Sequence, residues 1–313
     1  MTYILNRLLS IALTLLLISV VTFAVTTILP GDVATMIMGT QSNPAALSGL
    51  RKALGLNDPL IVQYGRWIGG MATGDWGRSL VFKVSIADLL IQKIKASSLI
   101  VAMSMAIALS CAIPLGVWAA VHRGRWQDVT SSSAALVGVS LPDFFWGIMM
   151  ILLFARVLGW FPSSGFADPA VNIKQALTHA FLPSLALGLG LMAQLTRMTR
   201  ATMTGILGQE FIRVGRAKGL AERTIVWRYA LANAIGPVIT VAGLQVGYLF
   251  GSIIVVETLF NYTGMGWLTY QALLNRDIPL IQATVFVIAA FVMLTNLIVD
   301  LLYLYVDPRI RLE

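Results

Sequence analysis

Long apolar runs separated by short charged segments are the dominant pattern of this 313-residue chain. A helix needs about 20 consecutive apolar residues to cross the hydrocarbon core of a bilayer. Six runs reach or approach that length, which is typical of a protein that crosses a membrane several times. The predicted spans are residues 8–29, 96–121, 129–155, 180–196, 229–256 and 278–299.

Two of these runs have alternative interpretations. Residues 180–196 form the shortest run, so a buried or interfacial helix is the alternative to a span there. Residues 8–29 follow Arg7, as the apolar part of a secretory signal would. That run is longer than the usual signal region of about 7–15 residues, and no small-x-small cleavage site precedes Pro30. We therefore expect an all-α membrane protein with six transmembrane helices.

The composition agrees with this fold class. Hydrophobic residues make up 58% of the chain and charged residues 12%, whereas soluble domains carry about 25% charged residues. The net charge of +8 would suggest a nucleic-acid partner in a soluble protein. Here the charges lie between apolar runs, so we expect membrane lipid and other proteins as partners, and no nucleic acid. The single cysteine, Cys111, excludes an internal disulfide framework.

The positions of the basic residues predict the orientation. Seven Lys or Arg residues lie between Arg197 and Arg228, whereas the short loops on the other side together hold three. Because basic residues concentrate in cytoplasmic loops, residues 197–228 are expected to be cytoplasmic, and both termini with them.

The longest external segment, residues 30–95, shows helices and turns. Pro30-Gly31-Asp32 indicates a turn, and a helix is expected from Asn43-Pro44 through Leu54. A break at residues 57–59 is followed by a second amphipathic helix and a turn at residues 74–77. Residues 84–95 are expected to form a helix at the membrane surface. We expect a small helical cap without chemistry.

The cytoplasmic segment 197–228 predicts a basic hairpin. The residues before Gly219 favour a helix, and Gly219 suits the left-handed position that ends it. Ala221-Glu222-Arg223 is a suitable start for the next helix. Such a projecting element either binds a partner protein or acts only as a topology determinant that touches lipid headgroups.

Polar residues inside the predicted spans bear on a pathway. Asp143 lies near the middle of the third span beside Pro142, and a carboxylate there is costly unless it faces a cavity or a partner. It either attracts an ammonium group of the cargo or accepts hydrogen bonds freed by the kink at Pro142. In the fifth span, two stripes repeat with helical spacing. The stripe of small residues is Gly243, Gly247 and Gly251. The polar stripe is Gln245, Tyr248 and Ser252. This polar stripe either lines a water-filled path or contacts a partner chain.

The sequence contains no phosphate-binding pattern G-x-x-x-x-G-K-[ST] and no His/Cys metal-ligand spacing. His122 and His179 are isolated at span ends, where histidines are usually structural. We expect no catalytic residue, no metal and no cofactor in this chain, so any energy source must be another subunit.

Several blocks of sequence resemble the permeases of binding-protein-dependent ABC importers, in particular the dipeptide/oligopeptide group. Arg216-Ala217-Lys218-Gly219-Leu220 is similar to the cytoplasmic loop of that family. Three further blocks resemble the peptide group: Leu29-Pro30-Gly31-Asp32, Gly74-Asp75-Trp76-Gly77 and the tail Asp307-Pro308-Arg309-Ile310-Arg311. The blocks cover nearly the whole chain in order. The general loop motif begins Glu-Ala-Ala, where Arg213-Val214-Gly215 stands, and ends on a proline, where Ala232 stands.

This resemblance implies a type I importer architecture in the bacterial inner membrane. It implies a homologous second permease subunit, two ATPase subunits that carry ATP and magnesium, and an external solute-binding protein. A coupling helix around residues 213–221 would dock on the ATPase. The residues expected to couple to it are Arg213, Gly215, Arg216, Ala217, Lys218, Gly219 and Leu220.

The expected division is an N-terminal helix with its external loop, residues 1–95, and a five-helix core, residues 96–313, that contains the coupling loop. The resemblance leaves the cargo open among dipeptides, oligopeptides, glutathione, nickel complexes and opine-like compounds. A secondary transporter or channel that works without ATPases is the main rival. An intramembrane serine protease is the other, but Ser163-Ser164-Gly165 lies in an outer loop and no span carries a mid-depth histidine.

Overall fold

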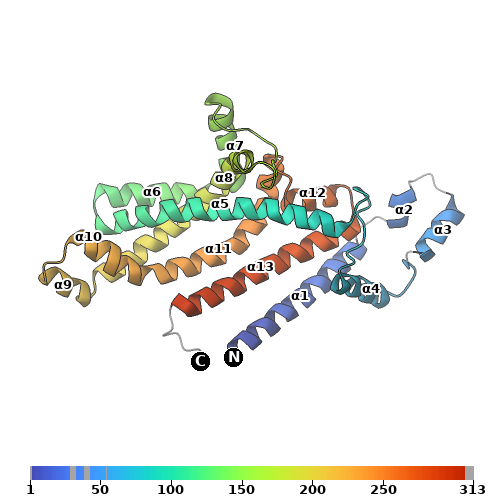
Figure 1. Cartoon of the computed structure of the whole chain (residues 1–313), viewed down its shortest axis with the longest axis horizontal. Helices are drawn as coiled ribbons and strands as arrows, with labels where there is room; N and C mark the ends of the chain where they lie inside the picture. Colours follow the sequence, from blue (N-terminus) through green and yellow to red (C-terminus); the bar gives the residue numbers. More distant parts are fainter. Residues whose placement is uncertain (1, 29–32, 39–42, 54, 307–313) are drawn as a thin grey trace. The chain divides into compact units, whose positions relative to one another are not determined.

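The computed structural model describes residues 2–28, 33–38, 43–53 and 55–306, and these form helices joined by short loops (Figure 1). The blocks at residues 29–32 and 307–311, and Leu54, lie outside the described residues. The chain divides into two compact units. The first contains residues 1–96 and 263–293, and the second contains residues 97–262 and 294–313.

The apolar runs of the sequence form the long helices. Five helical stretches are long and apolar enough to cross a membrane, and a bent pair of helices makes a sixth, so the predicted number of spans is confirmed with that pair counted as one. The helices of these spans are α1 (Thr2–Ile28), α5 (Ile86–Val121), α6 (Trp126–Ser140) with α7 (Asp143–Met150) and η1 (Ile151–Val157), α8 (Ile173–Leu207), η2 (Ile225–Ala230) with α11 (Leu231–Leu259), and α13 (Ile278–Val306).

The third span bends at Pro142, where the sequence predicts a kink, and the bend is large. The helix axis turns by 102° between α6 and α7–η1, and Figure 1 shows α7 leaving the direction of α6. Leu141 is extended, with φ −104° and ψ 136°. The residue before a proline is sterically restricted to this region, and Pro142 has no N–H to continue the helix. The Leu141-Pro142 pair therefore ends α6 and re-aims the chain at Asp143.

Two other expectations change in the structure. Residues 84–95 do not form a separate surface helix, because from Ile86 they are continuous with the second span as the 36-residue helix α5. No proline or glycine lies between Ile86 and Pro114 to break it. The fourth run extends far beyond residues 180–196 into the 35-residue helix α8, long enough to span.

The first unit holds the short helices that follow α1. They are α2 (Val33–Met38), α3 (Pro44–Ala53), α4 (Leu60–Thr73) and α12 (Met265–Leu274). The predicted helix start at Pro44 and the turn after α4 are confirmed, since Gly74 caps α4 in the left-handed conformation with φ 87°. Tyr64 and Trp67 of α4 pack on Phe23 of α1 with ring centroids 5.5 and 6.0 Å apart.

A buried carboxylate joins the external loop to the start of α13 in the first unit. Asp277, fully buried, accepts hydrogen bonds from the Ser79 hydroxyl at 2.6 Å and from the Val81 amide at 3.1 Å. Its other oxygen lies 3.3 Å from the Leu280 amide in the first turn of α13. The acidic side chain therefore caps α13 and holds the external loop to it.

The second unit is built around α8, which packs against α6, α7 and α11. The buried face of α8 carries small residues such as Ala186 and Gly188, and a Cβ on Gly188 would lie 3.3 Å from the Ser104 carbonyl oxygen of α5. Glu257 of α11 is fully buried and accepts a 2.5 Å hydrogen bond from the Ser97 hydroxyl of α5. Small side chains thus allow close helix approach, and a satisfied polar group joins α5 to α11.

Replacing Asp277 with alanine tests whether this side chain caps α13 and holds the external loop. The D277A variant leaves the Ser79 hydroxyl and the Val81 amide without their buried acceptor, at a cost of about 1–3 kcal/mol per unsatisfied group. We expect the thermal midpoint of the detergent-purified protein to fall by about 5 °C or more. The control is D88A, which removes an exposed carboxylate from the start of α5. Equal midpoints for both variants would contradict the capping role.

Candidate translocation path and coupling hairpin

Asp143 lies at the bend of the third span, as the first residue of α7. Tyr248 Oη of α11 donates to Asp143 Oδ2 over 3.5 Å, and the Ser252 hydroxyl also contacts this carboxylate. From α8, Gly190 leaves room for it, because a Cβ at Gly190 would lie 3.2 Å from Asp143 Oδ1. Three helices therefore converge on one half-buried carboxylate.

The backbone around Pro142 satisfies itself without Asp143. The amides of Phe145 and Trp146 donate to the Pro142 carbonyl at 3.0 and 3.3 Å. Within the described part of the chain, the hydrogen bonds of the Asp143 carboxylate come from the two hydroxyls of α11. Three of the four predicted path residues are thus brought together, and Gln245 lies one turn before Tyr248 on the same face of α11.

A cleft of about 680 Å³ lies between α6, α8 and α11. Its walls carry both polar and apolar side chains, and we refer to it as the polar cleft. The lining residues are Ser132, Leu136, Val139, Gln194, Arg197, Met198, Arg200, Ala201 and Val241.

The two arginines of the polar cleft differ in their partners. Arg200 binds the nearly buried carboxylate of Asp128 with two nitrogens, Nε to Oδ1 and Nη2 to Oδ2, the latter at 2.8 Å. The Gly124 amide donates to the same carboxylate at 3.0 Å. Arg197, one turn earlier on α8, is exposed and has no ion pair or hydrogen-bond partner among the described residues. Arg200 is therefore structural, and Arg197 keeps its charge available.

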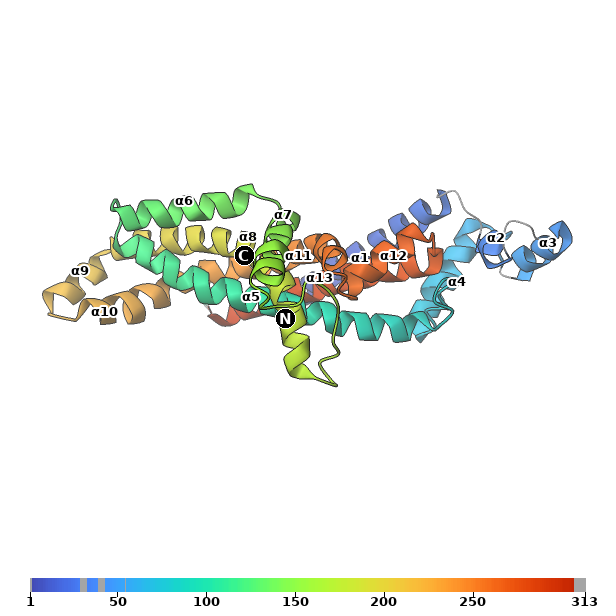
Figure 2. The same ribbon diagram turned by 90° about the horizontal axis from the view of Figure 1, so that it is seen from above.

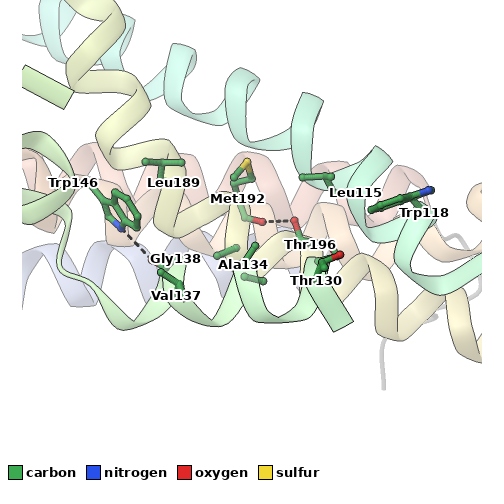
Figure 3. Close-up of a pocket in the computed structure, with 13 residues that line it drawn as sticks. Leu115, Trp118, Thr130, Ala134, Val137, Gly138, Trp146, Leu189, Met192 and Thr196 are labelled. Atoms are coloured by element: carbon green, nitrogen blue, oxygen red, sulfur yellow. Dashed lines mark hydrogen bonds between the residues drawn. The ribbon is translucent and has the colours of Figure 1, made fainter. Parts of the chain in front are cut away.

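A second cavity, of about 570 Å³, is apolar (Figure 3). Trp118 and Leu115 of α5, Trp146 of α7 and Met192 of α8 are among its lining residues. The Trp146 indole donates to the Gly138 carbonyl of α6 at 3.4 Å. Hydroxyl groups and the two indoles are the polar N–H and O–H groups among the side chains of this lining, so the cavity offers no charged group to a charged solute.

The glycine stripe of α11 has different surroundings along its length. Gly243 is buried, and a Cβ there would collide with the side chain of Val299 on α13. Gly247 is half-buried, and Gly251 is exposed with nothing within 4 Å of an added Cβ. Gly243 thus permits close packing inside this chain, and a partner helix at the other two glycines stays a prediction.

The predicted basic hairpin is present as α9 (Glu210–Ala217) and α10 (Glu222–Thr224). Gly219 has φ 76°, which confirms the left-handed position after α9, and Ala221 precedes α10 as predicted. Both views place the hairpin beyond the ends of α5 and α6 (Figures 1 and 2). Ile212 anchors it in a buried cluster with Ile225 and Val226.

The outer surface of the hairpin mixes charge with apolar groups. Phe211, Val214 and Leu220 are 41%, 46% and 38% exposed. Arg216 Nε pairs with Glu222 Oε1 at 2.6 Å across the Gly219 turn, and this hydrogen bond raises the pKa of Arg216. Arg213, Ala217 and Lys218 are exposed, and Gly215 lies against Leu220. Arg216 therefore contributes to the hairpin's own structure, and the coupling residues remain predictions.

The histidines are explained by local hydrogen bonds. The Nδ1 atoms of His122 and His179 each lie 2.9 Å from the backbone carbonyl four residues earlier, Trp118 and Gln175 respectively. In the described part of the chain, no group of three His, Cys, Asp or Glu residues is placed to hold a metal ion.

Sequence reasoning missed the polar cleft and the roles of the residues around it. The sequence pattern places Arg197 and Arg200 only among the basic residues that predict orientation, and it assigns no role to Asp128. Asp128 near the start of an apolar run was the available signal, since a carboxylate there needs a cation. Nothing in the sequence indicated that Arg200, rather than Arg197, would supply it.

Comparison with known proteins identifies the family. Residues 112–312 match the sequence profile described as "Binding-protein-dependent transport system inner membrane component". The chain belongs to this family. Residues 1–81 match the companion profile for the N-terminal part of such membrane components. This permease chain is accordingly a multi-pass protein of the bacterial inner membrane, and its family works with a binding protein and an ATPase.

Curated relatives cover the permease from end to end. The chain is 36% identical to "Dipeptide transport system permease protein DppB" of Alkalihalophilus pseudofirmus, over 99% of both chains. It is 37% identical to "Glutathione transport system permease protein GsiC" of Escherichia coli strain K12, again over 99% of both. Among solved structures, a chain of the inward-facing MetNI methionine ABC transporter matches with a TM-score of 0.59 and 20% identity, over 70% of this chain and 96% of that one. The last match supports the fold alone.

A double-mutant cycle tests the structural role of Arg200. The R200Q variant leaves the buried Asp128 carboxylate without its cation, and because Arg200 is partly exposed we expect a loss of about 1–3 kcal/mol. The thermal midpoint should fall by several degrees, and the double variant D128N/R200Q should recover part of the loss. The matched control is R197Q, which removes the same charge one turn away without breaking an ion pair. Equal losses in R197Q and R200Q would refute the assignment.

Proposed function

We propose that this chain is one of the pore-forming permease subunits of an ATP-driven importer that moves di- and oligopeptides or similar small solutes. Its end-to-end similarity to permeases named for dipeptide and glutathione transport carries the proposal. Both named cargoes are short peptides, so a short peptide is the cargo class that the relatives have in common.

The chain would work with four kinds of partner: a homologous second permease, two ATPase subunits, an external solute-binding protein and the surrounding lipid. ATP and magnesium would bind to the ATPases. The hairpin of α9 and α10 would dock on an ATPase, because it combines exposed apolar groups at Phe211, Val214 and Leu220 with basic groups at Arg213 and Lys218.

Closure of the ATPases on ATP would move the docked hairpin and, through the buried cluster at Ile212, the helices behind it. The two permease chains would exchange inward for outward access as rigid bodies. Such a cycle needs ATP and the loaded binding protein to favour the two states differently. Residues 1–95 would contribute a transmembrane helix and an external helical loop, and residues 96–313 the moving five-helix core.

The path through the core would pass Asp143, Gln245, Tyr248 and Ser252, which share one region of the second unit. A secondary transporter or channel is the alternative. It would have no use for a projecting hairpin with an exposed apolar surface, which favours the ATP-driven importer.

Uptake measurements test the proposal directly. The permease, expressed with its partner subunits in cells that lack other peptide importers, should accumulate a radiolabelled tripeptide. Accumulation should stop when the ATPase subunits carry an inactivating change. Accumulation that persists with inactive ATPases, or without them, would instead identify a secondary transporter.

Replacing Val214 with aspartate tests the docking surface. The V214D variant puts a carboxylate into an apolar contact, and we expect ATPase co-purification and ATP-driven uptake to fall about tenfold, because burying an unpaired charge costs more than the 1.4 kcal/mol that tenfold represents. The control is V171D, which places the same charge on an exposed valine outside the hairpin. Normal co-purification and uptake with V214D would exclude this face as the docking surface.

A further inference from the structure

Asp143 of α7 and Arg197 of α8 carry opposite charges, and neither has a charged partner among the described residues. Asp143 is half-buried and has no cation within ion-pair distance in the described part of the chain, where its contacts are the hydroxyls of Tyr248 and Ser252. Arg197 lines the polar cleft and likewise has no carboxylate partner among those residues. A carboxylate inside a span, such as Asp143, is costly unless something compensates its charge, and Arg197 lies at the start of the segment expected to be cytoplasmic.

The surroundings of Asp143 continue into the polar cleft along two helices. Gly190 faces Asp143 from α8, and Gln194, four residues later on the same face, lines the cleft. Tyr248 contacts Asp143 from α11, and Val241, seven residues earlier on the same face, also lines the cleft. The carboxylate is therefore about one helical turn of α8 away from Gln194 in the cleft lining, and Arg197 is itself part of that lining.

The rise of α8 between the residue that faces Asp143 and Arg197 corresponds to the length of a short peptide. Gly190 and Arg197 are seven residues apart on α8, which at 1.5 Å per residue is about 10 Å. An extended chain rises about 3.3–3.6 Å per residue, so about three residues cover that distance. The cleft volume of about 680 Å³ is within the range of about 300–1,000 Å³ that small-molecule sites have.

We propose that the polar cleft binds a short peptide as an extended zwitterion, with its ammonium group at Asp143 and its carboxylate at Arg197. This inference rests on the proposed function and adds a recognition site within the permease itself.

The chemistry of the two ends fits this assignment. A carboxylate offers about four lone-pair directions, and the two hydroxyls of α11 use only part of them. These contacts leave acceptors on Asp143 for an ammonium group. Arg197 presents the planar donor fork that suits a carboxylate. Arg200 is held by Asp128 and does not compete for the peptide's carboxylate.

The positions of the negative Asp143 and the positive Arg197 also determine the direction in which the peptide binds. Its amino terminus lies at the bend of the third span, and its carboxyl terminus points along α8 toward the end that carries the hairpin. Gln194 lies between the two charged groups on α8 and offers both a donor and an acceptor to the peptide backbone. A cargo without one terminal charge leaves one protein charge uncompensated.

Paired substrates and variants test the two ends separately. The substrates are radiolabelled trialanine, N-acetyl-trialanine and trialanine amide, taken up by cells that carry the complete importer as their only peptide importer. With D143N, the preference for trialanine over its acetylated form should fall about tenfold or more, as expected for the loss of a hydrogen bond to a charged group. The preference over the amide should not change. With R197Q the pattern should reverse, so that only the preference over the amide falls.

Control variants separate recognition from folding and charge balance. D143E keeps the carboxylate and should retain the preference for the free amino terminus. R123Q removes an exposed arginine near the same end of the spans without touching the cleft, and should keep both preferences. Because each readout is a ratio between two substrates of one variant, reduced expression does not change it.

The outcomes distinguish the two proposals. The zwitterion site is overturned if a variant takes up all three substrates less well by the same factor, or if neither preference ratio changes. ATP-driven uptake by the unmodified complex is unaffected by that outcome. Failure of the unmodified complex to accumulate trialanine or any other short peptide overturns the proposed function, and this site with it. Selective loss at the matching end in both variants supports the site.

Discussion

The absence of water in the bilayer core is the constraint on which this structure depends. A polar group there must find its partner inside the protein, because the lipid offers none. Asp128 is paired with Arg200, and Glu257 accepts from Ser97. These contacts join helices that are distant in sequence, so the same bonds that satisfy the polar groups also hold the second unit together. Asp143 differs from them, because in the described part of the chain its contacts are hydroxyl groups and no cation pairs with it.

The bend at Leu141-Pro142 connects this constraint to function. A straight third span would continue the α6 helix past Asp143. The loss of one N–H donor and the extended conformation before the proline end α6 instead. Asp143 then begins α7, where α8 and α11 also converge. The local backbone geometry thus places a charged group at the meeting point of three helices, near the polar cleft, where Arg197 has no ion pair among the described residues.

The hairpin of α9 and α10 differs from the spans in length and charge. It is short and basic, and it lies outside the long helices, yet its inner face is anchored by Ile212 in the same buried cluster as Ile225. Packed side chains, rather than a flexible linker, therefore connect the hairpin to the helices behind it. Its own ion pair, Arg216 with Glu222, and the left-handed Gly219 keep its two helices together.

The sequence by itself determined the features that depend on neighbouring residues. Apolar run length predicted the spans, and Gly219 and Ala221 predicted the limits of the hairpin helices, because helix formation and capping are local. The tertiary structure decided what depends on residues far apart in the chain. Nothing near Arg197 or Arg200 says which one Asp128 will bind, and nothing near Asp143 reveals Tyr248 or Gly190. Hydrogen bonds and ion pairs between helices depend on how those helices pack, and packing is a property of the whole unit.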